Sequence, residues 1–204
     1  MFALVDKSDN SITRMLSGSQ GITLDGIQHP KAIFSLWTEA ERNAINIYTV
    51  EINNSKRKNT EWYVNTNVTY SFNGSKVTGS YGDATARAHA DTLFTAQDES
   101  DGKGTEGDVK DEGLKTKLIR SIKSQAEGEL NKTDWYITRK AEKYTAIPSA
   151  VSTHRDSVRS KQAEMETAIT NASDTPALET LYTYTTQEDG STTRPLGELP
   201  TKDF

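Results

Sequence analysis

Apolar and polar residues alternate most clearly in two parts of the N-terminal half. Phe2 to Val5 and Ile12 to Leu16 each have the pattern of a short strand, and the polar residues Lys7 to Asn10 between them suit a turn. A second alternating run places five apolar residues on one face: Trp62, Val64, Val68, Tyr70 and Phe72. Asn73-Gly74 follows this run and predicts a type I′ turn. We therefore expect two β-hairpins, with the aromatic face of the second packed in the core of a small sheet.

Two short helices are also expected in this half. Thr38 and Glu41 have the spacing of a capping box, which predicts a helix from about Thr38 to Asn43. The alanine-rich stretch from Asp83 to Phe94 favours a second helix.

The C-terminal half has the periodicity of helices. Apolar residues recur at spacings of three and four along 114–130: Leu114, Leu118, Ile119, Ile122, Ala126 and Leu130. Asp134 suits an N-cap, and Trp135 begins a run that must end near Ile147, because the residue before a proline avoids the α region. Pro148 then suits the first position of another helix.

This last helix carries a narrow apolar stripe at heptad spacing: Val151, Val158, Met165 and Ala172, with Ile169 alongside. A stripe this narrow needs a neighbouring helix. We therefore expect a small antiparallel bundle, in which the Trp135 ring is buried between the Leu114 helix and the Pro148 helix.

The whole pattern predicts an α+β fold with four parts. Residues 1–97 form a small antiparallel β-rich module, and 98–113 form an acidic, glycine-rich linker with seven acids, two lysines and four glycines. Residues 114–173 form the helical module. The Thr-rich residues 174–204 form an extended tail that is too polar to build its own core.

Composition points to a molecule that completes its burial against a partner. Only 33% of residues are apolar, which is low for a chain of 204 residues. The net charge is −5, yet 110–161 carry twelve Lys and Arg against seven Asp and Glu. Acids are interspersed among these basic residues, and no aromatic platform accompanies them, so we favour a protein-facing role over nucleic-acid binding. No run of residues has the length and hydropathy of a membrane span or a signal peptide, so no membrane partner is expected.

Catalytic chemistry is not indicated. The histidines His29, His89 and His154 lack metal-ligand spacing, and no nucleophile elbow or phosphate loop is present. The acidic stretch from Asp98 fits no register of a calcium loop. The chain has no cysteine, which excludes disulfides and thiolate metal sites. We expect no enzyme activity, no cofactor and no metal.

A string of C-terminal residues resembles a known family: Thr133-Asp134-Trp135, Arg139, Glu142, Ile147-Pro148, Val151, Arg155 and Val158-Arg159. They are similar to the C-terminal region of small tail-associated proteins encoded beside tail-fibre genes in bacteriophages, especially marine ones. The His29-Pro30 and Leu36-Trp37 segments extend the likeness to the N-terminal half, so it spans roughly Met1 to Ser173. The resemblance implies a structural viral tail protein of the virion, oligomeric there, which binds other tail or tail-fibre proteins and occupies the host cytoplasm during virion assembly.

Two alternatives stay open. The first is a tail-fibre assembly chaperone that leaves before the virion is complete, although members of the short chaperone type often end soon after the last helix, whereas this chain continues for about thirty residues of Thr-rich sequence. The second, more remote, is a carbohydrate-active tail enzyme, since carboxylate pairs are assembled by the fold. The candidate partner-binding residues are Trp135, Arg139, Glu142, Pro148, Arg155 and Arg159. The arginines either dock on an acidic partner or hold the helices together internally.

Overall fold

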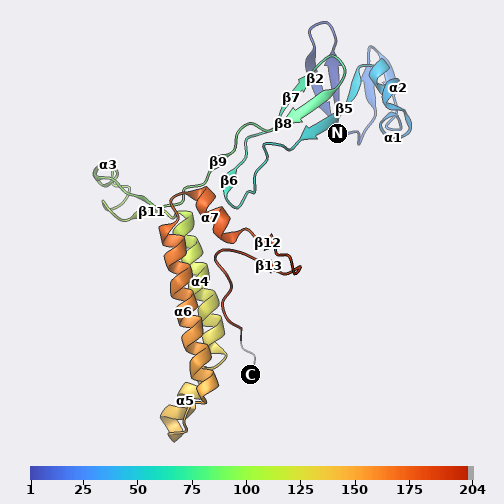
Figure 1. Cartoon of the computed structure of the whole chain (residues 1–204). Helices are drawn as coiled ribbons and strands as arrows, with labels where there is room; N and C mark the ends of the chain where they lie inside the picture. Colours follow the sequence, from blue (N-terminus) through green and yellow to red (C-terminus); the bar gives the residue numbers. More distant parts are fainter. Residues whose placement is uncertain (202–204) are drawn as a thin grey trace. The chain divides into compact units, whose positions relative to one another are not determined.

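The computed structural model describes residues 1–201 and divides the chain into two compact units, Met1–Thr85 and Ala86–Phe204 (Figure 1). The first unit is rich in strands, and the second contains the long helices, as an α+β class requires. The division follows Thr85, whereas the sequence predicted it after residue 97. Residues 86–97 therefore belong with the helices.

A five-stranded sheet forms the centre of the first unit. Its strands, in spatial order, are β2 (Ser11–Leu16), β1 (Phe2–Asp6), β5 (Ile47–Asn53), β8 (Val77–Ser80) and β7 (Thr69–Phe72). The other elements of this unit are β3 (Ile22–Leu24), β4 (Ile27–His29), α1 (Ile33–Leu36), α2 (Glu39–Ala44) and β6 (Tyr63–Val64). The β1–β2 hairpin confirms the first prediction.

The sheet is mixed rather than antiparallel as expected. β5 and β8 pair in parallel, while the other three pairs are antiparallel. After β5 the chain makes a long connection before it returns, so the β7–β8 hairpin adds to the sheet with β8 running alongside β5.

Apolar residues fill both faces of this sheet. Along β1, Ala3 and Val5 belong to a cluster with Tyr48 and Val77. The intervening residues Phe2 and Leu4 pack on the opposite face, against a cluster of three fully or nearly buried isoleucines, Ile22, Ile33 and Ile47. Alternation along the strand thus sends successive side chains into two different cores.

Two local predictions in this unit had different outcomes. The capping box is confirmed, because Thr38 Oγ1 accepts from the Glu41 N–H at 3.3 Å and Glu41 Oε2 accepts from the Thr38 N–H at 2.7 Å. The aromatic face of the second hairpin is only partly buried: Trp62 is 3% exposed, whereas Val64 and Tyr70 are 51% and 36% exposed. The regular alternation fails because the pairing of β7 with β8 begins only at Thr69.

The turn of that hairpin is also different from the predicted type. Gly74 has a φ of 93°, but Asn73 stays outside the left-handed region that a type I′ turn requires. Instead, Asn73 Oδ1 accepts from the N–H groups of Ser75 and Lys76, at 3.0 and 2.9 Å. The side chain therefore holds a longer loop in the manner of an Asx-turn.

Two antiparallel helices dominate the second unit: α4 (Leu114–Asn131) and α6 (Ser149–Asn171) (Figure 1). Ile122 and Ala126 of α4 are buried, as are the heptad residues of α6 that the sequence predicted: Val151, Val158, Met165, Ala172 and the neighbouring Ile169. The apolar stripes therefore confirm the two long helices. The intervening helix α5 (Asp134–Lys143) lies at the turn between them, so the expected three-helix bundle is a helix pair.

The residues before α4 form no helix, contrary to the prediction for 83–94. They contain β9 (Thr85–Ala86) and β10 (Thr92–Leu93). The carbonyl oxygens of Ala88 and His89 accept from the first N–H groups of α4, those of Leu114 and Lys115, at 2.9 and 3.0 Å. A helix would need these carbonyl groups for its own hydrogen bonds, so capping α4 excludes it.

Asp91 completes this cap from the same segment. Its carboxylate accepts from the Gly113 N–H and from Thr116 Oγ1, each at 2.7 Å. Gly113 occupies the N-cap position and has no side chain, so Asp91 fixes the start of α4 from outside the helix. The Thr116 hydroxyl, followed by the Gly113 N–H, lowers the pKa of Asp91 below its ordinary value.

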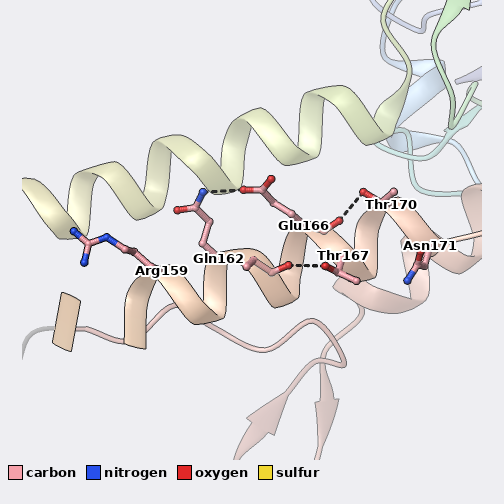
Figure 2. Close-up of a pocket in the computed structure, with 7 residues that line it drawn as sticks. Arg159, Gln162, Glu166, Thr167, Thr170 and Asn171 are labelled. Atoms are coloured by element: carbon pink, nitrogen blue, oxygen red, sulfur yellow. Dashed lines mark hydrogen bonds between the residues drawn. The ribbon is translucent and has the colours of Figure 1, made fainter. Parts of the chain in front are cut away.

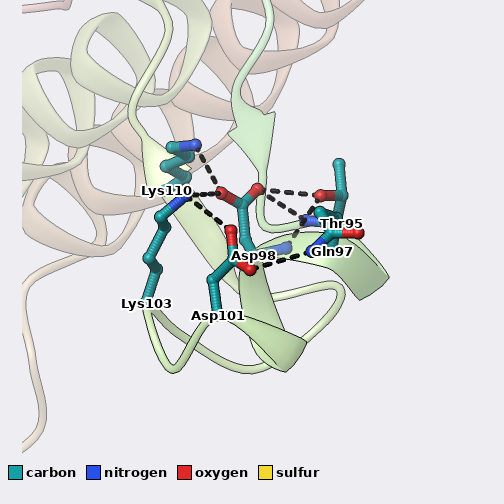
Figure 3. Close-up of polar contacts among 6 residues, drawn as sticks. All are labelled: Thr95, Gln97, Asp98, Asp101, Lys103 and Lys110. Atoms are coloured by element: carbon teal, nitrogen blue, oxygen red, sulfur yellow. Dashed lines mark hydrogen bonds and ion pairs between the residues drawn. The ribbon is translucent and has the colours of Figure 1, made fainter.

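The predicted acidic linker contains secondary structure. It contains β11 (Val109–Asp111), which pairs with β10, and most of α3 (Ala96–Ser100). Figure 3 shows how Asp98 accepts hydrogen bonds from the N–H and hydroxyl of Thr95, at 3.1 and 2.9 Å, and from Lys110 Nζ at 3.0 Å. The Thr95 backbone bond, with Lys110, lowers the pKa of Asp98 to about 2. The Asp98 carboxylate thus connects Thr95 to Lys110 within a segment whose glycine content had suggested a flexible linker.

The tail is folded rather than extended. α7 (Thr175–Tyr182) begins at Asp174, whose side chain accepts from the Ala177 N–H, and it buries Leu178 completely. A short hairpin follows, formed by β12 (Thr185–Thr186) and β13 (Thr192–Thr193). Leu196 is then 2% exposed, and its N–H bonds to the Leu181 carbonyl. The tail makes no separate core but adds its few apolar residues to this unit. The last three residues of the predicted tail, 202–204, lie outside the described part.

Candidate protein-binding site

Helix α5 is the most exposed helix of the second unit. None of its ten residues is buried. Trp135 and Ile137 are 51% and 42% exposed, and Tyr144, which follows the helix, is 92% exposed. An isolated helix of this length is marginal in water, and a helix is normally stabilised by packing an apolar face. The exposed apolar side chains of α5 therefore mark a surface that another molecule can cover.

A buried arginine fixes the beginning of α5. Arg155 of α6 is 8% exposed, and its Nη1 donates to the Leu130 carbonyl at 2.8 Å, to Thr133 Oγ1 at 2.7 Å and to Asp134 Oδ1 at 2.7 Å. These acceptors lie at the end of α4 and the start of α5. Arg155 thus holds the helices together internally, which was one of the two roles expected for the arginines.

Trp135 is not buried between helices as the sequence predicted. Its ring lies 3.8 Å from that of Tyr136, and the Arg139 guanidinium lies 4.6 Å from the Trp135 ring centre and 5.2 Å from that of Tyr136. The burial prediction required a three-helix bundle, whereas α5 is short and lies beyond the contact of α4 with α6. The indole instead forms part of a surface stack in which a cation faces aromatic rings.

A second group of exposed side chains lies further along α5. Each of Ile137, Lys140, Ala141 and Tyr144 is three or four positions from two of the others, and together they line a shallow hollow of about 390 Å³. Tyr144 has a left-handed φ of 55°, and its N–H donates to the Lys140 carbonyl at 3.0 Å, so it closes the helix. We name these four residues, together with Trp135, Tyr136 and Arg139, the α5 surface.

The α5 surface is positively charged. Residues 132–143 hold four cations and two acids. Asp134 is paired with Arg155, and Lys132 is paired with Glu129 at 2.6 Å. Without these two pairs, residues 132–143 keep three cations, Arg139, Lys140 and Lys143, and one acid, Glu142. The surface therefore combines aromatic and aliphatic groups with a positive rim, a composition typical of protein-binding residues.

The sequence-predicted site residues divide between this surface and other places. Trp135, Arg139 and Glu142 lie on α5, and Glu142 is exposed there. Pro148 is the N-cap residue of α6, and Arg159 lies on the exposed side of that helix, paired with Asp156 at 3.2 Å. Sequence reasoning missed Tyr136, Ile137 and Tyr144. The spacing of Ile137, Ala141 and Tyr144 on a short helix was the signal for the apolar group.

A groove of about 530 Å³ runs along α6, where Figure 2 shows its lining residues. Most of its polar groups already have partners: Gln162 donates to Glu166 at 2.8 Å, and the hydroxyls of Thr167 and Thr170 donate to carbonyl groups of their own helix. Glu166 also pairs with Lys123 of α4. Nothing in the groove converges on a reacting atom, as an active site would require.

Residues 1–201 contain no group of three His, Asp or Glu side chains that could hold a metal ion. His29 lies in β4 beside Trp37, His89 lies in the segment that caps α4, and His154 is buried in α6. In the described part of the chain, none of the helices combines the length and hydropathy needed to span a bilayer.

Comparison with known proteins identifies no relative: no family model, no curated protein and no solved structure matches this chain.

Proposed function

We propose that this chain is a tail-associated structural protein of a bacteriophage virion, which acts by binding other tail or fibre proteins and performs no catalysis. The phage context rests on the sequence resemblance around Trp135, Arg139 and Pro148. The binding role rests on one observation above all: α5 has no buried residue and displays Trp135, Ile137 and Tyr144 to solvent.

The accessible surface of the chain supports a binding role. It amounts to 12880 Å², whereas a compact protein of this mass exposes about 9,500 Å². Two separate compact units of these lengths would expose about 11,400 Å² together. The surplus of roughly 1,500 Å² exceeds the area of about 800 Å² that one partner contributes to a standard interface.

Quantitative mass spectrometry of purified phage particles tests the proposal. A structural protein is present in a fixed ratio to the other tail proteins. A protein that is made during infection but absent from particles is the assembly chaperone, and that result would reject a virion role.

A matched pair of variants tests the role of α5 in the same particles. Trp135→Ala should reduce incorporation, because it removes the largest exposed ring of the α5 surface. Leu36→Ala removes a 79% exposed side chain from the first unit and serves as the control. Equal incorporation of both variants would show that the particle contact lies elsewhere.

A further inference from the structure

A second exposed surface lies on the hairpin before α4. Leu93 and Val109 are cross-strand partners in β10 and β11, and each is 49% exposed. Partners in an antiparallel pair project to the same side, so they form one apolar patch. The nearby acidic residues Glu106, Asp108 and Asp111 are exposed as well. We name these five residues the hairpin surface.

The cations of this segment do not neutralise the hairpin surface. Lys110 is paired with Asp98 at 3.0 Å, and Lys103 is paired with Asp101 at 2.8 Å (Figure 3). Within β11 successive residues point to opposite sides, so Val109 and Asp111 face away from Lys110, while Asp108 lies in the bend just before the strand. The apolar patch therefore has an acidic border.

The hairpin surface and the α5 surface complement each other. One presents Leu93 and Val109 with carboxylates around them, and the other presents Ile137 and Tyr144 with Lys140 and Lys143 nearby. Apolar groups can pack at the centre of such a contact while opposite charges meet at its border.

The two surfaces belong to opposite ends of α4, because β11 ends just before this helix and α5 begins just after it. Eighteen helical residues separate the ends by about 27 Å. One copy of this unit cannot bring its own two surfaces together, so the complementary surface must come from a second copy.

We propose that this protein associates with itself head to tail, with the α5 surface of one copy on the hairpin surface of the next. The inference rests on the proposed function, since it names a second copy as a partner of the same binding surface. Such a contact is heterologous: each copy retains one free surface of each kind, and assembly continues to a ring or an open chain.

Sedimentation velocity of the full chain tests the association. At about 50 mM salt the average mass should rise above the 22.6 kDa of one chain as the protein concentration increases, and about 500 mM salt should weaken the association because the charges at the border are exposed. A monomer at every concentration would overturn the proposal. Stoichiometric presence in particles, together with a monomer in solution, would leave the virion role intact and assign the α5 surface to a different protein.

Charge reversal identifies the two surfaces. Lys140→Glu with Lys143→Glu changes the α5 surface, and Asp108→Lys with Asp111→Lys changes the hairpin surface. Each double variant should lower the association constant at least about tenfold. A chain that carries all four substitutions should associate again, because its charges are exchanged rather than removed. Circular dichroism confirms that each variant is folded.

Mixing the two double variants distinguishes head-to-tail contact from other arrangements. The α5 variant keeps its hairpin surface, and the hairpin variant keeps its α5 surface, so an equimolar mixture can form the unaltered junction as well as the charge-exchanged junction. The mixture should therefore associate at concentrations at which neither variant associates alone. Normal association of the hairpin variant alone would mean that two α5 surfaces bind each other, and this would contradict the proposal.

Discussion

Trp135 distinguishes binding from stability at the scale of one residue. Because its side chain is half exposed, Trp135→Ala should lower the free energy of unfolding by less than about 1 kcal/mol. The expected loss comes from the exposed cation–π contact with Arg139. Ile169→Ala, at a fully buried position of α6, should cost about 2–5 kcal/mol. Urea unfolding of the two variants measures the difference. A loss of several kcal/mol from Trp135→Ala would mean that the indole is buried after all.

Arg155 and Arg159 are four residues apart and should respond differently to substitution. Arg155→Met removes the donor that bonds the buried Thr133 hydroxyl and the Leu130 carbonyl, so the free energy of unfolding should fall by about 2–3 kcal/mol. The loss is not larger because Asp134, the third acceptor, is half exposed and can bind water. Arg159→Ala should change the free energy of unfolding by less than about 0.5 kcal/mol, since its pair with Asp156 is exposed. Chemical denaturation compares them, and equal losses would contradict the assigned roles.

Asp98 makes the segment between β10 and β11 sensitive to acid. Its pKa in the folded protein is about 2, below the ordinary value of 3.8, so the charged carboxylate stabilises the fold. This contribution is complete above pH 3.8 and is lost as the pH falls toward 2. Carboxyl NMR should record a midpoint near 2. In Asp98→Asn the acid-dependent loss of structure around Thr95 and Lys110 should disappear, and a midpoint near 4 in the parent protein would disprove the contact.

At the scale of secondary structure, the start of α4 depends on close contact with the preceding segment. A Cβ atom added at Gly113 would lie 2.3 Å from the Ala90 carbonyl carbon, a distance that forces the backbone to move. Gly113→Ala should therefore destabilise the second unit by about 1–3 kcal/mol. Gly128 of the same helix has nothing within 4 Å of such a Cβ, and Gly128→Ala should stabilise it by roughly 0.5–1 kcal/mol. Thermal unfolding of both variants checks the opposite signs.

Elements with strong local signals could be predicted from the sequence. The Thr38 capping box needs only residues within one helical turn, and the β1–β2 hairpin needs only its alternation and a polar turn. The heptad stripe from Val151 to Ala172 was equally reliable, because periodic apolar residues need a partner helix wherever it comes from.

Elements determined by distant residues could not be predicted. The stretch 83–94 has an adequate helix propensity. Two of its carbonyl oxygens, however, accept hydrogen bonds from the N–H groups of Leu114 and Lys115. α7 is positioned partly by Thr175 Oγ1, which donates to the Arg87 carbonyl at 2.6 Å, across 88 residues. Hydrogen bonds over such separations leave no pattern within a short window of sequence.

The candidate site was predicted in part for the same reason. The large apolar ring of a Trp near a helix start predicts burial. The short length of α5 argued against it, because a short helix offers little surface to pack on its neighbours. The internal role of Arg155 was one of two alternatives, because a guanidinium can make forked bonds to carboxylate or carbonyl groups within the chain as well as to a partner. The hairpin surface had no sequence signal, since Leu93 and Val109 meet only through the register of β10 and β11.

At the scale of the whole molecule, the surplus surface agrees with more than one contact per copy. One partner contributes about 800 Å² to a standard interface, and the surplus of roughly 1,500 Å² is about twice this area. Head-to-tail association uses two surfaces of every copy and fits that amount.

Mass action then predicts a melting temperature that depends on protein concentration. Association stabilises the folded state, so at low salt the melting temperature of the full chain should rise by a few degrees between about 1 and 100 µM. The Lys140→Glu, Lys143→Glu variant should show a smaller rise over the same range, because it associates more weakly. Scanning calorimetry provides the measurement, and a constant value for the parent chain would contradict self-association.

The bond between Thr175 and Arg87 also sets an order of events during synthesis. At roughly 5–20 residues per second, a ribosome takes on the order of 10 s to add the 88 residues between these partners. The cores of the first unit draw only on residues before Thr85 and can form during that interval. α4 and α6 can pair next, while α7 arrives last. The hairpin surface can therefore be displayed on a nascent chain before the carbonyl of Arg87 meets its partner.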